Sequence, residues 1–189
     1  HGSNFKYPLP TKTKKGKWLE IGNINLCQIG FHFTIKPENW LCNSPRFFEV
    51  EIDFEKPVIF DNSDKICCSR ARLVREMDYS ELYEYGIYVN YIGGVRRDKK
   101  CYVFNSKVVA RGNSSVVAWE NSSVVARGNS SVVAWGNSSV VAWENSSVFI
   151  DNYSSANIDK QKIKDNAQII NRRDKKIYVL KSKFEIVEL

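Results

Sequence analysis

The side chains able to ligate a metal or act as strong nucleophiles are one histidine and five cysteines. His32 is the single histidine outside His1–Ser3, a segment that looks like a cloning scar. A single histidine excludes any metal or catalytic site that requires two histidines. The cysteines form no C-x-x-C pair, and their odd number fits reduced thiols in a cytosolic protein better than disulfides. They are Cys27, Cys42, Cys67, Cys68 and Cys101.

Two sites can be built from these residues. Cys27, His32 and Cys42 could ligate zinc, although their spacing differs from the usual C-x₂₋₄-C pairs. A Cys–His dyad of His32 with Cys27 or Cys42 is the alternative. No phosphate-binding loop, GxGxxG segment, nucleophile elbow or cluster of metal-binding carboxylates accompanies them. We expect no metal site and no cofactor.

The formal net charge of +7, with a pI near 9.1, is spread along the chain rather than gathered in one block. Such a balance favours a solvated surface but also permits nucleic-acid binding. The candidate contacts for nucleic acid are Lys12, Lys14, Lys15, Lys17, Arg70, Arg72, Arg96 and Arg97. No run approaches the ~18 apolar residues of a membrane span, and no signal-peptide pattern opens the chain. We expect a cytoplasmic protein without a membrane partner.

The elements that must position these residues divide into three regions. Residues 4–104 predict a small α+β head in which strands dominate, including a half-buried strand over Phe47–Glu55 with alternating apolar and acidic residues. Pro37 is suited to the first turn of a short helix. Residues 105–150 are a repeat array. Residues 151–189 predict a β cap, with a hairpin over Ile169–Leu180 and an alternating segment over Lys183–Leu189.

The array repeats an eight-residue unit, as in NSSVVAWE over Asn113–Glu120. Asn recurs at positions 105, 113, 121, 129, 137 and 145, and after Lys107 the variation is nearly confined to the seventh and eighth positions. The Val-Val pair and the recurring Asn, Ser and Gly disfavour a helix. Close identity at a fixed spacing predicts stacked strands, and hence a β-solenoid.

One turn of this solenoid could hold two octads or three. Arg and Trp alternate at the seventh position through Trp135, which favours two octads per turn, but Trp143 breaks the alternation. Six copies then make about three coils, ~14 Å tall at ~4.8 Å per layer. The head and the tail would cover the two open ends of the stack.

Within a strand, the small residues Val116 and Ala118 should point into the narrow core, and Val117 and Trp119 outward. The reverse would bury Arg111 and Arg127 without partners. Asn falls at the corners, where it tolerates left-handed backbone and can form a ladder between copies. Trp119 and Trp135 then share one outer row, and Arg111, Arg127 and Trp143 share the other. These rows either bind a partner or pack within the protein, for instance with Arg127 over Trp143.

The array resembles octad-repeat segments of bacteriophage and bacterial proteins, in which Gly-Asn-Ser/Ala-x-Val-x-Ala-aromatic units recur. The segments LCQIGFHFTI (Leu26–Ile35), FFEVEIDFE (Phe47–Glu55) and DKICCSRARLVRE (Asp64–Glu76) are similar to a poorly characterised domain that often precedes such arrays. This resemblance implies the architecture and a phage or mobile-element origin, without an activity.

A second resemblance is to ADP-ribosyltransferases. GFHFT (Gly30–Thr34) looks like their Gly-Phe-x-Ser-Thr-Ser strand, and EVE (Glu49–Glu51) looks like their Glu-x-Glu, although Phe33 replaces the first serine and no Arg precedes His32. The resemblance implies an NAD-dependent enzyme in which His32 holds the ribose, Tyr79 or Tyr83 stacks on nicotinamide, and Glu51 stabilises the cationic transition state.

The favoured hypothesis is a binding protein that sequesters or blocks a host protein, or self-associates, through the Trp/Arg rows or the basic head. An ADP-ribosyltransferase-like enzyme using NAD and a nucleic-acid-binding module are the alternatives.

Overall fold

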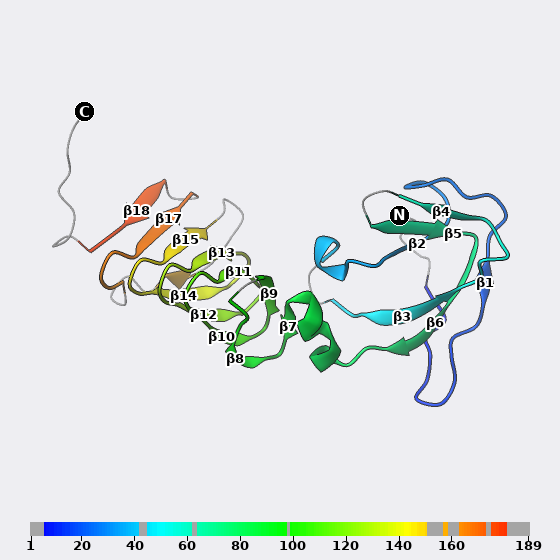
Figure 1. Cartoon of the computed structure of the whole chain (residues 1–189), viewed down its shortest axis with the longest axis horizontal. Coiled ribbons are helices and arrows are strands. Elements are labelled where there is room, and N and C mark those ends of the chain that lie inside the picture. The colour runs from blue at the N-terminus through cyan, green and yellow to red at the C-terminus, as the bar shows by residue number, and fades with distance from the viewer. Residues whose placement is uncertain are drawn as a thin grey trace. The chain divides into compact units, whose positions relative to one another are not determined.

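A computed structural model describes residues 6–41, 45–61, 64–97, 99–150, 157–158, 163–172 and 175–180. The protein is mainly β, as predicted, and its chain divides into two compact units. The N-terminal unit is residues 1–81 and the C-terminal unit is residues 82–189 (Figure 1).

The N-terminal unit contains two antiparallel three-stranded sheets. The first has the order β1 (Leu19–Glu20), β6 (Arg70–Glu76), β3 (Phe48–Ile52), and the second β2 (Phe31–Thr34), β5 (Lys65–Cys68), β4 (Val58–Phe60). The chain passes directly from β5 to β6 at the buried Ser69. One continuous segment therefore serves both sheets.

A small apolar cluster joins these strands. Phe31, Cys68 and Ala71 are its buried members, and Val50 and Ile52 of β3 pack against it. The predicted alternation along β3 is confirmed for these two residues. It is wrong for Phe54, which is 68% exposed because the strand ends at Ile52.

Helical structure in the described residues is limited to two 3₁₀ segments. η1 spans Pro37–Asn39 and begins at the predicted proline, and η2 spans Tyr79–Tyr85. In η2, Leu82 is fully buried.

The C-terminal unit contains the predicted β-solenoid, which is built from two facing sheets. The five-stranded sheet has the order β16 (Asn157–Ile158), β14 (Ser139–Ala142), β12 (Ser123–Ala126), β10 (Lys107–Ala110), β8 (Ile92–Gly94). The seven-stranded sheet has the order β18 (Lys176–Tyr178), β17 (Gln168–Asn171), β15 (Ser147–Ile150), β13 (Ser131–Ala134), β11 (Ser115–Trp119), β9 (Lys100–Phe104), β7 (Ile87–Val89). Successive octads enter alternate sheets.

The register confirms two octads per turn. Lys107 pairs with Ser123, and Ser115 pairs with Ser131, each in a parallel ladder. A residue therefore lies next to its equivalent two octads along, and octads of opposite parity form opposite sheets.

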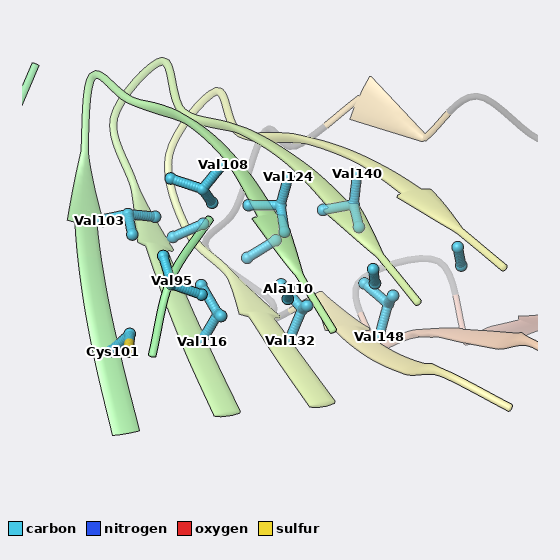
Figure 2. Close-up of a cluster of buried hydrophobic side chains, with 14 of the residues drawn as sticks. Val95, Cys101, Val103, Val108, Ala110, Val116, Val124, Val132, Val140 and Val148 are labelled. Carbon is cyan, nitrogen blue, oxygen red and sulfur yellow. The ribbon is translucent and has the colours of Figure 1, made fainter. Parts of the chain in front are cut away.

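The core of the solenoid is a double row of valines and alanines, as predicted. Val108, Val124 and Val140 project from the five-stranded sheet toward Val116, Val132 and Val148 of the seven-stranded sheet (Figure 2). All six are at most 2% exposed. Val and Ala fill the interior between the repeated octads because the two sheets close on each other within one octad of chain, and the larger Ile150 and Ile169 are buried toward the last layers.

The solenoid has about four turns in residues 87–150, where about three were predicted. The additional layer comes from β7, β8 and β9, which precede the perfect octads. Cys101 and Val103 of β9 face the core in register with Val116 and Ala118. Inward apolar residues at the right spacing are sufficient for stacking, and octad identity is not required.

Apolar side chains close both ends of the core. Tyr83 and Tyr91 pack against it at the first layers, and Ile163, Ile169 and Tyr178 at the last. The predicted hairpin is confirmed, since β18 pairs antiparallel with β17. The predicted segment Lys183–Leu189 lies outside the described residues.

Candidate functional site

The corners of the solenoid separate the varied seventh-position residues into two columns, as the two-octad turn requires. Trp119 ends a strand of the seven-stranded sheet and Trp135 follows the next one, whereas Arg127 and Trp143 follow strands of the five-stranded sheet. Arg111 precedes Arg127 in the second column and is exposed. The predicted rows of the array therefore exist.

The aromatic column is a continuous stack. The Phe104 and Trp119 rings have centroids 5.9 Å apart and an interplanar angle of 15°, and Trp119 and Trp135 are 5.4 Å apart at 9°. Because Trp119 lies between two rings, its faces cannot stack on a base or a sugar. At Trp119, a ligand can therefore contact only the edge of the ring.

The second column is a cation–π stack around Trp143. The Arg127 guanidinium carbon lies 4.5 Å from the ring centroid, and Lys164 Nζ lies 4.6 Å from it. The Arg127 contact was among the predicted alternatives, but Lys164 was missed. Its signal is KDNA (Lys164–Ala167), a diverged form of the RGNS corner (Arg127–Ser130).

Asparagine ladders run along both corners, as predicted. Asn129 donates to Asn113 over 3.4 Å, Asn145 to Asn129 over 3.3 Å, and Asn166 continues the ladder to Asn145 over 3.0 Å. The predicted left-handed backbone of Asn is confirmed at Asn105, whose φ is 46°, but is wrong for the later corners. There the eighth residue has positive φ, at Gly112, Glu120, Gly128, Gly136 and Glu144.

The second octad position is a structural feature that the sequence prediction missed. Its serines are buried at the corners. Ser114 donates its hydroxyl to the Arg111 carbonyl over 2.6 Å, and Ser138 does the same to Trp135 over 2.6 Å. The available signal was that Ser occupies this position in every copy. These bonds satisfy carbonyls where the ladder is interrupted by the turn.

The outer face of the seven-stranded sheet carries an apolar row beside the aromatic column. Tyr102, Val117, Val133, Phe149 and Ile170 occupy equivalent positions on five neighbouring strands. Val117 is only 6% exposed, and the other four are partly exposed. The five-stranded sheet carries a matching row at Val109, Val125 and Val141. We call the first of these the outer apolar row.

Three of the predicted basic residues of the head lie on one face of the β6–β3 sheet, but carboxylates pair with them. Lys15 and Arg72 each approach Glu51 at 2.8 Å, and Arg70 approaches Asp53 at 2.7 Å. The two arginines also contact Trp18, with guanidinium carbons 4.9 and 4.6 Å from its ring centroid. Lys15 and Arg72 hold the pKa of the Glu51 carboxyl below its usual range. Local neutralisation weakens the attraction of this face for phosphates.

Lys14, another of the predicted basic residues, is exposed. Its backbone N–H donates to Thr11 Oγ1 over 3.1 Å. Its side chain extends the charge of this segment into solvent without entering the ion-pair network described above.

Of the residues of the predicted ADP-ribosyltransferase site, His32, Glu51 and the alternative Tyr79 belong to the N-terminal unit, whereas Tyr83 does not. His32 lies on β2 and Glu51 on β3, in different sheets of the N-terminal unit. Tyr83 belongs to the C-terminal unit and packs on Tyr88 and Tyr91, with centroids 5.1 and 5.2 Å away. The enzyme hypothesis stays a prediction, which NAD turnover by the wild type and by His32→Ala and Glu51→Ala would test.

The structure describes Cys27 and His32 of the Cys–His site that the sequence suggested. The backbone N–H of Cys27 donates to His32 Nε2 over 3.0 Å, so the imidazole lone pair is not directed at the thiol. Lys65 Nζ lies 3.3 Å from Cys27 Sγ. Cys42 lies outside the described residues. Within the ranges described above, no group of three His, Cys, Asp or Glu side chains is arranged to hold a metal ion.

Cys27, Cys67, Cys68 and Cys101 are free thiols, as predicted for reduced cysteines. No helix in the described part of the chain is long and apolar enough to span a membrane. Comparisons with models of protein families, with curated proteins and with solved structures found no match.

Proposed function

We propose that this chain is a binding protein whose solenoid presents the outer apolar row and the edge of the aromatic column to a protein partner. The observation that carries the proposal is the position of Val117 and Val133, each two residues before a tryptophan of the Trp119–Trp135 stack, in a parallel ladder that continues to Phe149. Contiguous apolar side chains on an outer face are typical of protein contact surfaces.

The geometry favours a protein over a nucleic acid or a sugar. The faces of Trp119 are covered, so the stacking platform that single-stranded nucleic acids need is missing on that ring. The members of the outer apolar row are uncharged, and cations lie over two of its rings, Lys100 over Tyr102 at 5.2 Å and Arg172 over Phe149 at 5.9 Å. Aliphatic and aromatic side chains on a rigid sheet suit an apolar protein surface, from a host protein or from a second copy of the chain.

The test compares two valines at the same octad position on opposite sheets. Val133→Lys places a charge in the outer apolar row, and Val125→Lys places the same charge on the five-stranded sheet. Because the array resembles those of phage and bacterial proteins, the bait is offered to a bacterial lysate and bound proteins are quantified by mass spectrometry. Sedimentation velocity measures self-association in parallel.

The proposal predicts that Val133→Lys loses the captured partner or the dimer at least tenfold, whereas Val125→Lys retains it and both variants melt near the wild-type temperature. Equal binding by Val133→Lys and the wild type would contradict the proposal. A loss confined to Val125→Lys would assign the surface to the other sheet.

A further inference from the structure

A pocket of about 470 Å³ opens in the N-terminal unit. It lies within the volume range of small-molecule sites, about 300–1,000 Å³. Six of its seven lining residues are aliphatic or aromatic, and none is acidic. The lining is Lys6, Tyr7, Leu9, Phe33, Phe48, Val50 and Leu73. All belong to residues 1–81, so the pocket is a property of that unit alone.

The pocket adjoins the small apolar cluster of this unit. Tyr7 packs on Phe31 and on Phe33, with ring centroids 5.9 and 6.2 Å apart, and Val50 contacts the same cluster. Tyr7, Phe33 and Val50 therefore line the cluster and the pocket together, and each stays only partly buried. Apolar side chains around an open space of this size lose dispersion contacts that an apolar ligand would restore.

Two of the lining residues, Lys6 and Tyr7, carry polar side-chain groups. Lys6 is exposed, and among the described residues no ion pair of its ammonium group is found. Burial raises the pKa of the neighbouring Tyr7 to about 12, so its phenol adds no negative charge to the lining. The ammonium group of Lys6 and the absence of carboxylates from the lining both favour an anion over a cation.

We propose that this pocket binds a small anionic amphiphile, with its apolar body against Phe33, Phe48 and Val50 and its carboxylate or equivalent anion at Lys6. The inference is independent of the proposed role of the solenoid, since the residues belong to a different unit. The N-terminal unit would thereby add a small-molecule ligand to a protein-binding array.

The test measures the affinity of the full chain for three ten-carbon probes by isothermal titration calorimetry, below their micelle concentrations. Decanoate, decan-1-ol and decyltrimethylammonium share the apolar body and differ in head-group charge. Lys6→Ala removes the proposed cation, and Lys17→Ala is the matched control on an exposed lysine outside the pocket lining. Leu9→Trp and Val50→Trp fill the pocket. Leu9 is 54% exposed, so Leu9→Trp leaves the core intact if Val50→Trp unfolds the unit.

We expect one decanoate per chain, with weaker binding of the alcohol and the ammonium probe. Lys6→Ala should weaken decanoate about threefold to fivefold, as expected for a partly exposed charge pair, and leave decanol unchanged. Leu9→Trp should abolish binding of both.

Four results would overturn the proposal. Equal affinity for the cationic probe, or an unchanged decanoate affinity in Lys6→Ala, would contradict an anionic head group at Lys6. Undiminished binding by folded Leu9→Trp would place the ligand elsewhere. Binding to anionic phospholipid vesicles without binding of monomeric decanoate would replace a free amphiphile with a membrane surface.

Discussion

Trp119 is held through both faces of its ring, and not through its indole N–H. Phe104 and Trp135 stack on it at 5.9 and 5.4 Å, while its Nε1 atom is buried and has no hydrogen-bond partner among the described residues. Burial of an unpaired donor opposes folding, so the stacking must outweigh it. The residue is therefore structural as well as a possible edge contact.

Trp119→Ala should lower the free energy of unfolding of the solenoid by about 2–3 kcal/mol, because two aromatic contacts and a large partly buried surface are lost. Trp119→Phe keeps a ring in the column and removes the unpaired N–H, so it should lose less than half as much. Urea unfolding followed by circular dichroism measures both. An alanine variant as stable as the wild type would show that the stack contributes nothing.

The eighth octad position combines left-handed backbone with close stacking between layers. A Cβ on Gly128, whose φ is +70°, would lie 2.9 Å from the backbone N of Gly112. Glu144 occupies the equivalent place one turn later, where its carboxylate accepts the Gly128 N–H over 2.7 Å. That bond compensates for the strained backbone, which explains why Glu is the alternative to Gly.

Gly128→Ala should therefore destabilise the solenoid by about 1–2 kcal/mol, the usual cost of left-handed backbone for an L-residue. Gly94→Ala is the control, since its Cβ would be 4.0 Å from the nearest atom, the Val109 carbonyl oxygen. Thermal unfolding of the two variants separates backbone strain from the mere addition of a methyl group. Equal melting temperatures would be inconsistent with the strain.

At the residue scale, the sequence was sufficient to predict the contacts of a residue wherever that residue packs against its equivalents in neighbouring octads. The inward Val116 and Ala118 and the Asn113–Asn129 ladder follow from the period and the side-chain alternation. The buried bond of Ser114 to the Arg111 carbonyl could not be predicted, because it depends on the turn geometry of the corner. The pocket at Lys6 and Tyr7 depends on contacts between distant segments, which no local pattern encodes.

Among the elements, β17 shows how far the repeat extends beyond recognisable sequence. Asn166 joins the corner ladder, Asp165 has the positive φ of the eighth position, and Ala167 replaces the buried serine. Lys164 completes the cation–π column on Trp143. Sequence identity was the criterion for the predicted array, whereas the fold preserves only size, polarity and backbone conformation.

The β6–η2 connection should make the N-terminal unit sensitive to acid. Arg75 and the Asp78 N–H lower the pKa of the Glu81 carboxyl from 4.5 to about 2. A carboxyl with a depressed pKa in the folded state stabilises that state above its unfolded pKa and loses this effect as pH falls toward the folded value. We therefore expect the melting temperature of this unit to fall between about pH 4.5 and 2.

Glu81→Gln removes this titration, so the variant should start less stable at pH 6 and show a shallower decline in acid. Differential scanning calorimetry at several pH values measures the change. Glu144→Gln is a control in the solenoid, where the same substitution leaves the Arg75 pair intact. Identical pH profiles for the wild type and Glu81→Gln would refute the role of this ion pair.

For the whole molecule, the chain divides into two compact units between residues 81 and 82. This division predicts that the solenoid folds without the N-terminal unit. Its end-closing side chains Tyr83 and Tyr91 lie on its own side of that division, so truncation leaves the first layer covered. A fragment of residues 82–189 should unfold cooperatively and retain the captured partner. A fragment that aggregates or lacks a thermal transition would show that the N-terminal unit is needed to close the stack.

The two-layer arrangement of octads could be predicted from the Arg and Trp alternation, but the number of turns could not. The layer formed by β7–β9 has no octad identity, and its membership depends on Cys101 and Val103 meeting the core in register. Likewise, Arg70 and Arg72 pair with Asp53 and Glu51, which lie just after and within β3. This pairing depends on how the strands of the sheet align, so the net charge of the sequence overestimated the unpaired positive charge of the head.

The most direct test of the central claim, that two octads make one turn and so hold each outer row on its own sheet, is a pair of deletions. Removing Asn113–Gly128, two octads, should leave every column intact, with Arg111 replacing Arg127 under Trp143. Removing only Asn113–Glu120 moves every later strand to the opposite sheet and misplaces β17.

Thermal unfolding by circular dichroism, with dye binding to exposed apolar surface, compares the two deletions. The two-octad deletion should unfold cooperatively within several degrees of the wild type, because stability in such stacks is approximately a sum over repeats and their interfaces. The one-octad deletion should lose cooperativity and bind the dye. Equal stability of the two deletions would contradict a two-octad turn.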